Sequence, residues 1–173
     1  MSQAHRQEIR VPGMPEPISH FTHVVRAGRL VFVSGCVASD EQGRTVGGGD
    51  IVAQTRQVHE NIKRCLAAAG ATFADVCKVT VFLKNVADRE KVNTVRQAYF
   101  GAHRPASTLL EISRLVRDDL LIEIECTAVL PECADRQPAA PRVRKTGRPE
   151  PRASRSGHPR RKPGSRPPQQ KGR

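Results

Sequence analysis

Two kinds of hydrophobic pattern alternate along the first 130 residues of the chain. Five runs rich in β-branched and other apolar residues have the composition and length of strands. They lie at 21–25, 30–35, 77–83, 106–114 and 121–130. Between them, apolar residues recur at spacings of three and four over 51–69 and again over 92–99, which predicts two amphipathic helices. The expected order is β-β-α-β-α-β-β, an α+β fold.

Polar residues at the borders of the two predicted helices suggest where they begin and end. Asp50 and Asp88 each stand where a helix N-cap is expected, and a short acidic side chain there can accept a hydrogen bond from the first free backbone N–H groups. Gly70 and Gly101 follow the last residues of the periodic segments, as glycine often does just past a helix.

Alternation along the last two strands predicts a sheet with two unlike faces. In 121–130 the apolar set Ile122, Ile124, Cys126 and Ala128 alternates with the polar set Glu123, Glu125 and Thr127. Since two helices cannot cover both faces of such a sheet, we expect both on the apolar face. We expect Ser107 on the opposite, helix-free face together with Glu123. That face is either solvated or an oligomer interface or binding site.

Composition divides the chain into three parts. Residues 1–16 are polar and proline-bearing and are expected to form a loose arm, followed by a domain over 17–132. From Ala134 to Arg173 the chain has thirteen Lys and Arg and two acids, so +11 of the net charge of +12 lies there. Residues 133–173 have few apolar side chains to bury, which predicts a disordered basic tail able to bind nucleic acid without sequence preference.

The five cysteines are scattered without a CxxC or CxxH pair, so a zinc site is not expected. The N-terminus lacks the apolar core of a signal peptide, and no apolar run reaches the roughly 18 residues of a membrane span. A cytoplasmic protein with no membrane partner is the expectation.

Two segments carry a family resemblance. The sequence HRPASTLLEISRL spans 103–115, and LIEIECTAV spans 121–129. With FVSG at 32–35 and VNT at 92–94, they resemble the signature of the RidA family, which is also called YjgF-like or L-PSP endoribonuclease-like. The resemblance implies a chorismate-mutase-like fold with a mixed sheet, assembled as a homotrimer with sites in the clefts between subunits. It also implies hydrolysis of small reactive imines and enamines to 2-keto acids and ammonia, with no metal or organic cofactor.

The resemblance also assigns roles to individual residues. Glu123 corresponds to the glutamate that holds the attacking water, and a carboxylate can orient and partly deprotonate such a water. The residues expected to contact the substrate are Phe21, Ser34, Gly35, Asn93, Ser107, Thr108 and Leu109.

One departure from the signature bears on the reaction. Where active imine deaminases of the family have an arginine after Pro-Ala, this chain has Ser107. Arginine clamps a carboxylate through two charge-assisted hydrogen bonds, whereas a serine hydroxyl offers one neutral bond. The expectation is therefore a deaminase of an imine or related C=N compound that is not a standard 2-iminopropanoate deaminase. Arg104 and Arg114 are near in sequence, but no pattern shows that either replaces the missing charge.

Two other functions stay open at this stage. One is a trimer that binds a small metabolite in the same clefts with little catalysis. The other is binding of RNA or another polyanion through the basic tail.

Overall fold

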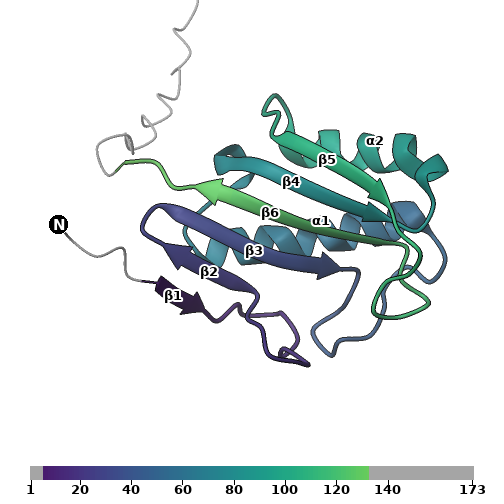
Figure 1. The fold of residues 1–173 in the computed structure, drawn as a ribbon, viewed down its shortest axis with the longest axis horizontal. Helices are drawn as coiled ribbons and strands as arrows, with labels where there is room; N and C mark the ends of the chain where they lie inside the picture. The colour runs from purple at the N-terminus through teal and green to yellow at the C-terminus, as the bar shows by residue number, and fades with distance from the viewer. Residues whose placement is uncertain (1–5, 133–173) are drawn as a thin grey trace, which may run out of the picture. The chain divides into compact units, whose positions relative to one another are not determined.

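The computed structural model describes residues 6–132, which form six strands, two α-helices and two short 3-10 helices (Figure 1). The strands are β1 (Arg6–Ile9), β2 (Val24–Ala27), β3 (Leu30–Val37), β4 (Val76–Leu83), β5 (Ala106–Glu111) and β6 (Ile122–Val129). The helices are α1 (Ile51–Ala68), α2 (Arg89–Phe100), η1 (Phe73–Asp75) and η2 (Val86–Asp88). Both predicted helices and all five predicted strands are present, with bounds that shift by up to three residues.

One mixed sheet contains all six strands, in the order β1-β2-β3-β6-β4-β5. Neighbouring strands are antiparallel except β4 and β5, which run parallel. A parallel pair needs a crossover, and α2 with η2 supplies it between these two strands. The edge strand β5 is thereby placed beside the C-terminal half of α2.

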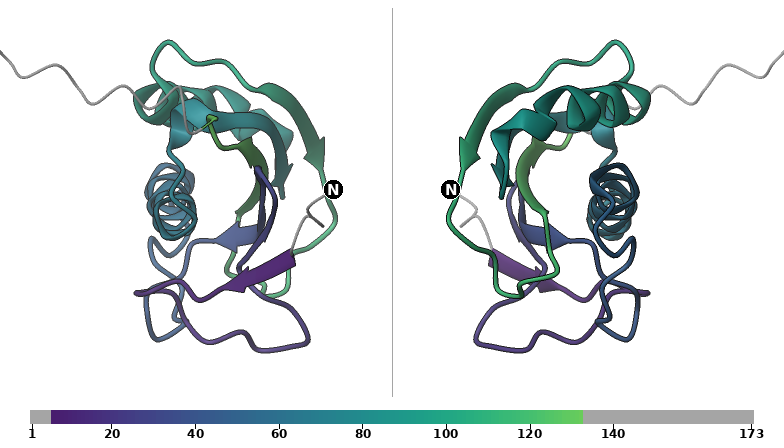
Figure 2. Two further views of the ribbon diagram at one scale, coloured as in Figure 1. Left: turned by 90° about the vertical axis from the view of Figure 1, so that its left-hand side faces the viewer. Right: turned by 90° about the vertical axis from the view of Figure 1, so that its right-hand side faces the viewer.

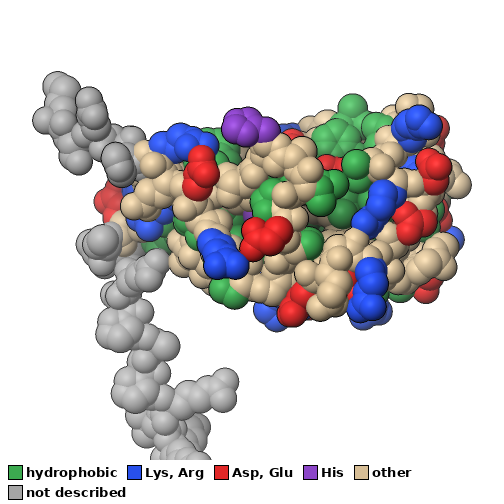
Figure 3. All heavy atoms as spheres, turned by 90° about the horizontal axis from the view of Figure 1, so that it is seen from below, with side chains coloured by type: hydrophobic (Ala, Val, Ile, Leu, Met, Phe, Trp, Pro, Cys, Tyr) green, Lys and Arg blue, Asp and Glu red, His purple; other side chains and the backbone are tan. Residues whose placement is uncertain are grey.

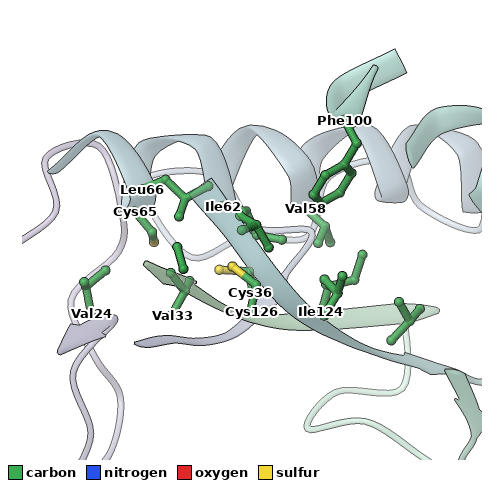
Figure 4. Packing of buried hydrophobic residues seen from close by; sticks show 14 of the residues in the cluster. Val24, Val33, Cys36, Val58, Ile62, Cys65, Leu66, Phe100, Ile124 and Cys126 are labelled. Atoms are coloured by element: carbon green, nitrogen blue, oxygen red, sulfur yellow. The ribbon is translucent and has the colours of Figure 1, made fainter. Parts of the chain in front are cut away.

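Both helices lie on the same side of the curved sheet, as the sequence predicts (Figure 2). Val58, Ile62 and Leu66 of α1 point at the sheet, and all three are almost completely buried (Figure 4). Opposite them, Ile124 and Cys126 of β6 contribute to the same core. Burial of this apolar stripe, rather than helix propensity alone, holds α1 in place.

The two candidate N-caps behave differently. The Asp50 carboxylate accepts hydrogen bonds from the backbone N–H groups of Val52 and Ala53, at 2.8 and 3.3 Å, and so caps α1. Asp88 is the N-cap residue of α2, as predicted, but its side chain makes no capping hydrogen bond. Its backbone is already helical because it ends η2, and its carboxylate pairs with Lys91 at 2.9 Å instead.

The expectation of a loose arm over residues 1–16 is wrong for residues 6–11. Residues 6–9 form β1, which pairs antiparallel with β2 through the backbone. Val11 is buried in the core, so the folded unit begins before residue 17. The predicted tail, residues 133–173, lies outside the described residues. None of the helices in the described part of the chain is long and apolar enough to cross a membrane.

The two faces of the sheet are as unlike as the sequence predicts, with one correction. Ile122, Ile124, Cys126 and Ala128 are buried on the helix side, and Glu123, Glu125 and Thr127 occupy the other side. Ser107, however, lies on the helix side. It is paired across the parallel ladder with the buried Val79, and paired residues of neighbouring strands share a face. Both alternating sets of β5 contain polar residues, so alternation alone could not decide which set faces the helices.

Candidate functional site

An irregularity in β3 creates the first feature of the candidate site. The pairing of β3 with β6 shifts register between Val33 and Cys36, so Ser34 and Gly35 form a bulge. The Ser34 backbone N–H donates to the His23 carbonyl at 3.0 Å, and its hydroxyl donates to the Thr22 carbonyl at 2.7 Å. These two bonds tie the bulge to the segment before β2.

The side chain of Glu123, on β6, lies directly over the bulge. A Cβ atom at position 35 would stand 1.8 Å from the Glu123 Oε1 atom and 2.8 Å from its Cδ. Gly35 is therefore required for this position of the carboxylate, because any larger residue would displace it. The RidA-like signature contains both residues, and the structure gives the physical reason for their pairing.

The Glu123 carboxylate is half-buried and lacks a cation. Among residues 6–132 it has no ion pair and no hydrogen-bond donor within reach. Burial, and secondly the negative charge of Glu125, raise the pKa of Glu123 above its ordinary value. A carboxylate with a raised pKa is a stronger base, and an unpaired one has free lone pairs for a water molecule.

A cleft of about 370 Å³ opens beside this carboxylate. Glu123, Gly35, Ser34 and Phe21 line it, so it brings together four of the eight site residues expected from the sequence. Phe21 lies at its rim with 42% of its surface exposed. The segment that carries Phe21 is at the lower edge of Figure 1, and Figure 3 shows this side with hydrophobic side chains exposed among charged ones.

The other four expected residues lie elsewhere in the chain. Asn93 is on α2, and Ser107, Thr108 and Leu109 follow one another on β5. Leu109 packs against the core, and the Thr108 hydroxyl accepts a hydrogen bond from Lys78 on the helix-free face. The eight residues therefore form two groups, the Glu123 cleft and the α2–β5 edge, which one chain does not bring together.

Arg96 is a residue that the sequence reasoning missed. Its guanidinium donates to the Ser107 hydroxyl at 3.0 Å and to the Asn93 side-chain oxygen at 3.4 Å, so it links two of the expected site residues. The spacing carried a signal, since residues three apart on a helix lie side by side and Asn93 thus points to Arg96. Of the two arginines considered from the sequence, Arg104 lines the same pocket as Arg96.

Among the residues that the structure describes, no group of three or more His, Cys, Asp or Glu side chains is placed to hold a metal ion. The four cysteines within this range are free thiols, and three of them are buried.

Comparison with known proteins identifies the family. The sequence family described as Endoribonuclease L-PSP matches residues 12–130. The 3-aminoacrylate deaminase RutC of Acinetobacter baylyi is 39% identical over 123 residues, which cover 70% of this chain and 97% of that protein. The 2-iminobutanoate/2-iminopropanoate deaminase of Salmonella typhimurium is 36% identical over 124 residues, covering 70% of this chain and 95% of that protein.

The fold comparison agrees. The crystal structure of YyfA, a Rid-family protein of Yersinia pestis, superposes with a TM-score of 0.69 at 30% identity, covering 73% of this chain and all of that one. The chain belongs to the Endoribonuclease L-PSP family, whose members include the RidA, YjgF and RutC proteins, and its α+β fold is the fold of that family.

The contact between Glu123 and Gly35 leads to a first prediction. In a Gly35→Ala variant the flexible Glu123 side chain should rotate away, because the added methyl group occupies the place of its carboxylate. The carboxylate then gains solvent, so its pKa should fall toward the ordinary value of a glutamate. Carboxyl-carbon NMR titration of the wild type and the variant measures this shift. A Glu123 pKa unchanged by the methyl group would contradict the close approach.

Proposed function

We propose that this protein is a deaminase that hydrolyses a small reactive imine or enamine. The observation that carries the proposal is the half-buried, unpaired Glu123 carboxylate beside an open cleft. The deaminase names of two relatives, each more than 35% identical, support the same reaction class.

In the proposed reaction Glu123 acts as a general base. Its carboxylate accepts a proton from a water molecule while the water oxygen attacks the imine carbon. The resulting tetrahedral adduct receives a proton on nitrogen, expels ammonia and leaves a C=O group, so the net change is imine plus water to ketone plus ammonia. An enamine enters the same path after protonation of its carbon. The cleft beside Gly35 holds the reacting carbon near the carboxylate.

We further propose that the complete site needs two copies of the chain within a homotrimer. In one chain the Glu123 carboxylate projects from the helix-free face, whereas Ser107 lies on the helix side of an edge strand. The strand β4 separates β6 from β5. The α2–β5 edge of one subunit set against the Glu123 cleft of the next would join the two groups, and three such contacts close a ring.

Exposed apolar side chains on the helix-free face support this assembly. Phe32 on β3 and Leu110 on β5 are 44% and 42% exposed there, on either side of the polar residues of β6. Large apolar side chains left exposed on a sheet face, here beside polar groups, are typical of a protein interface. A fully solvated sheet face would not need these two large apolar side chains.

Replacement of Glu123 tests the base. Glu123→Gln keeps the size of the side chain but cannot accept the proton, so turnover should fall by about 100-fold or more. Because the pKa of Glu123 is raised in the folded state, the ionised carboxylate lowers the free energy of unfolding at neutral pH. The variant should therefore melt at or above the wild-type temperature. Ammonia release from freshly generated imines and a thermal melt measure both.

A neighbouring carboxylate provides the matched control. Glu125→Gln should retain turnover, and because the Glu125 charge helps to raise the pKa of Glu123, the acidic limb of the rate profile should move to lower pH. Retained activity in Glu123→Gln, or equal losses in the two variants, would refute the role of Glu123.

The interface has a test of its own. Phe32→Glu places a charge in the proposed contact beside Glu125, and should convert the trimer to monomers at micromolar concentration. Ala67→Glu adds the same charge at an exposed position of α1, which covers the opposite face of the sheet, and should leave the trimer intact. Sedimentation equilibrium on the full-length chains distinguishes the two. A wild-type monomer, or dissociation by both substitutions alike, would contradict the proposed assembly.

A further inference from the structure

The guanidinium of Arg96 is a half-buried positive charge with only neutral partners. It donates to the Ser107 hydroxyl and to the Asn93 side-chain oxygen. In the described part of the chain Arg96 forms no ion pair with a carboxylate. Burial lowers the pKa of Arg96, yet a guanidinium keeps its proton at neutral pH. The fold thus maintains a partly desolvated cation without a counter-ion, which is unfavourable unless an anion binds.

The surroundings of Arg96 are shaped to receive an anion. A pocket of about 520 Å³ opens beside it between the end of α2 and the start of β5. The polar side chains that line it come from Asn93, Arg96, Gln97, His103 and Arg104, and none of its lining residues is acidic. Two guanidinium groups and an amide can together bind both oxygens of a planar carboxylate.

Nearby groups do not compete for this charge. The Glu60 carboxylate accepts a hydrogen bond from the Tyr99 hydroxyl at 2.8 Å and lies 3.9 Å from Lys63. His59 stacks on Tyr99 and is fully buried. Burial first, and the positive charge of Arg96 in addition, lower the pKa of His59 to about 4, so this imidazole is neutral at neutral pH. Neither Glu60 nor His59 therefore neutralises the charge of Arg96, which can interact with a bound anion.

We propose that Arg96, from α2, binds the carboxylate of a 2-imino or 2-amino-acrylic acid substrate and thereby supplies the charge that residue 107 lacks in this chain. Ser107 is then a positioning residue, because its hydroxyl orients one nitrogen of the Arg96 guanidinium. This inference rests on the proposed deaminase function and specifies its substrate class as carboxylate-bearing. It also changes the expectation drawn from Ser107 alone, since a guanidinium from a different element contacts the Ser107 hydroxyl.

The test uses binding rather than turnover, so that it does not depend on the reaction. Pyruvate is the stable 2-oxo acid of the expected product class, and pyruvamide is its uncharged analogue. Isothermal titration of the full-length protein at low salt should show pyruvate binding that weakens by at least about 10-fold in Arg96→Gln. Arg96→Lys keeps the charge without the planar fork, and should fall between the two.

A second arginine on the same helix gives the control. Arg89→Gln removes an equal charge, but the Arg89 guanidinium is exposed and pairs with Glu90, so this variant should bind pyruvate as the wild type does. Pyruvamide should bind weakly and with equal affinity to all four proteins. In steady-state assays Arg96→Gln should raise KM for a carboxylate-bearing imine more than it lowers kcat.

The outcomes separate the two proposals. Pyruvate affinity that is equal in wild type and Arg96→Gln, or wild-type protein that binds no pyruvate, would overturn the assignment of Arg96, whatever the enzyme's activity. Arg96-dependent pyruvate binding in a protein without deaminase activity would uphold the carboxylate site and refute the proposed reaction. Arg96-dependent binding together with deamination would support both.

Discussion

Two helices cover one face of a six-stranded sheet, and this leaves half of the side chains on every strand without cover from their own chain. This difference between the two faces determines which side chains are buried and where the Glu123 carboxylate lies. The helix-covered face can be wholly apolar, as it is along β6, while the other face carries Glu123 and Glu125 with exposed Phe32. The Glu123 carboxylate on that face is half-buried, and burial, followed by the negative charge of Glu125, raises its pKa. We propose that a second copy of the chain covers this face and completes the site.

A bulge in β3 turns this general constraint into a specific site. A side chain at position 35 of this bulge would occupy the place where the Glu123 carboxylate now lies. Two hydrogen bonds from Ser34 to the segment before β2 hold the irregular backbone. They connect the bulge under Glu123 to the segment that carries Phe21 at the rim of the cleft. At the edge of the sheet formed by β5, Arg96 and Ser107 form a second polar unit around a charge that has no counter-ion among residues 6–132. With Glu123 as the proposed base and Arg96 as the proposed substrate anchor, each unit lacks the group that the other supplies.

The sequence was most informative where burial imposes a period. The stripe of α1 and the alternation along β6 predicted both elements and the face that the helices cover, because a misplaced apolar residue there would cost burial energy. The sequence was uninformative where backbone pairing determines that a strand forms, or where register determines which face a side chain occupies. Strand β1 pairs by its backbone with polar side chains exposed, so no pattern marked residues 6–9. Ser107 was assigned to the wrong face because both sets of β5 are mixed, and only the parallel register with Val79 resolves them. Arg96 could not be linked to Ser107 from the sequence, because the two residues lie on different elements, α2 and β5. Only the packing of the helix beside the strand brings them into contact.

The central claim is that one functional site is built from two chains, with Glu123 from one and the α2–β5 edge from the other. Complementation between inactive subunits measures this directly. Glu123→Gln removes the base, and Ser107→Glu places a negative charge beside Arg96, so each variant alone should release little ammonia from a freshly generated imine. When the two are mixed under conditions that allow subunit exchange, sites that pair an intact Glu123 with an intact edge should form, and activity should return to about a quarter of the wild-type value for random exchange in a ring. No recovery, with exchange verified by mass spectrometry of the intact oligomers, would show that the two groups of residues do not share a site.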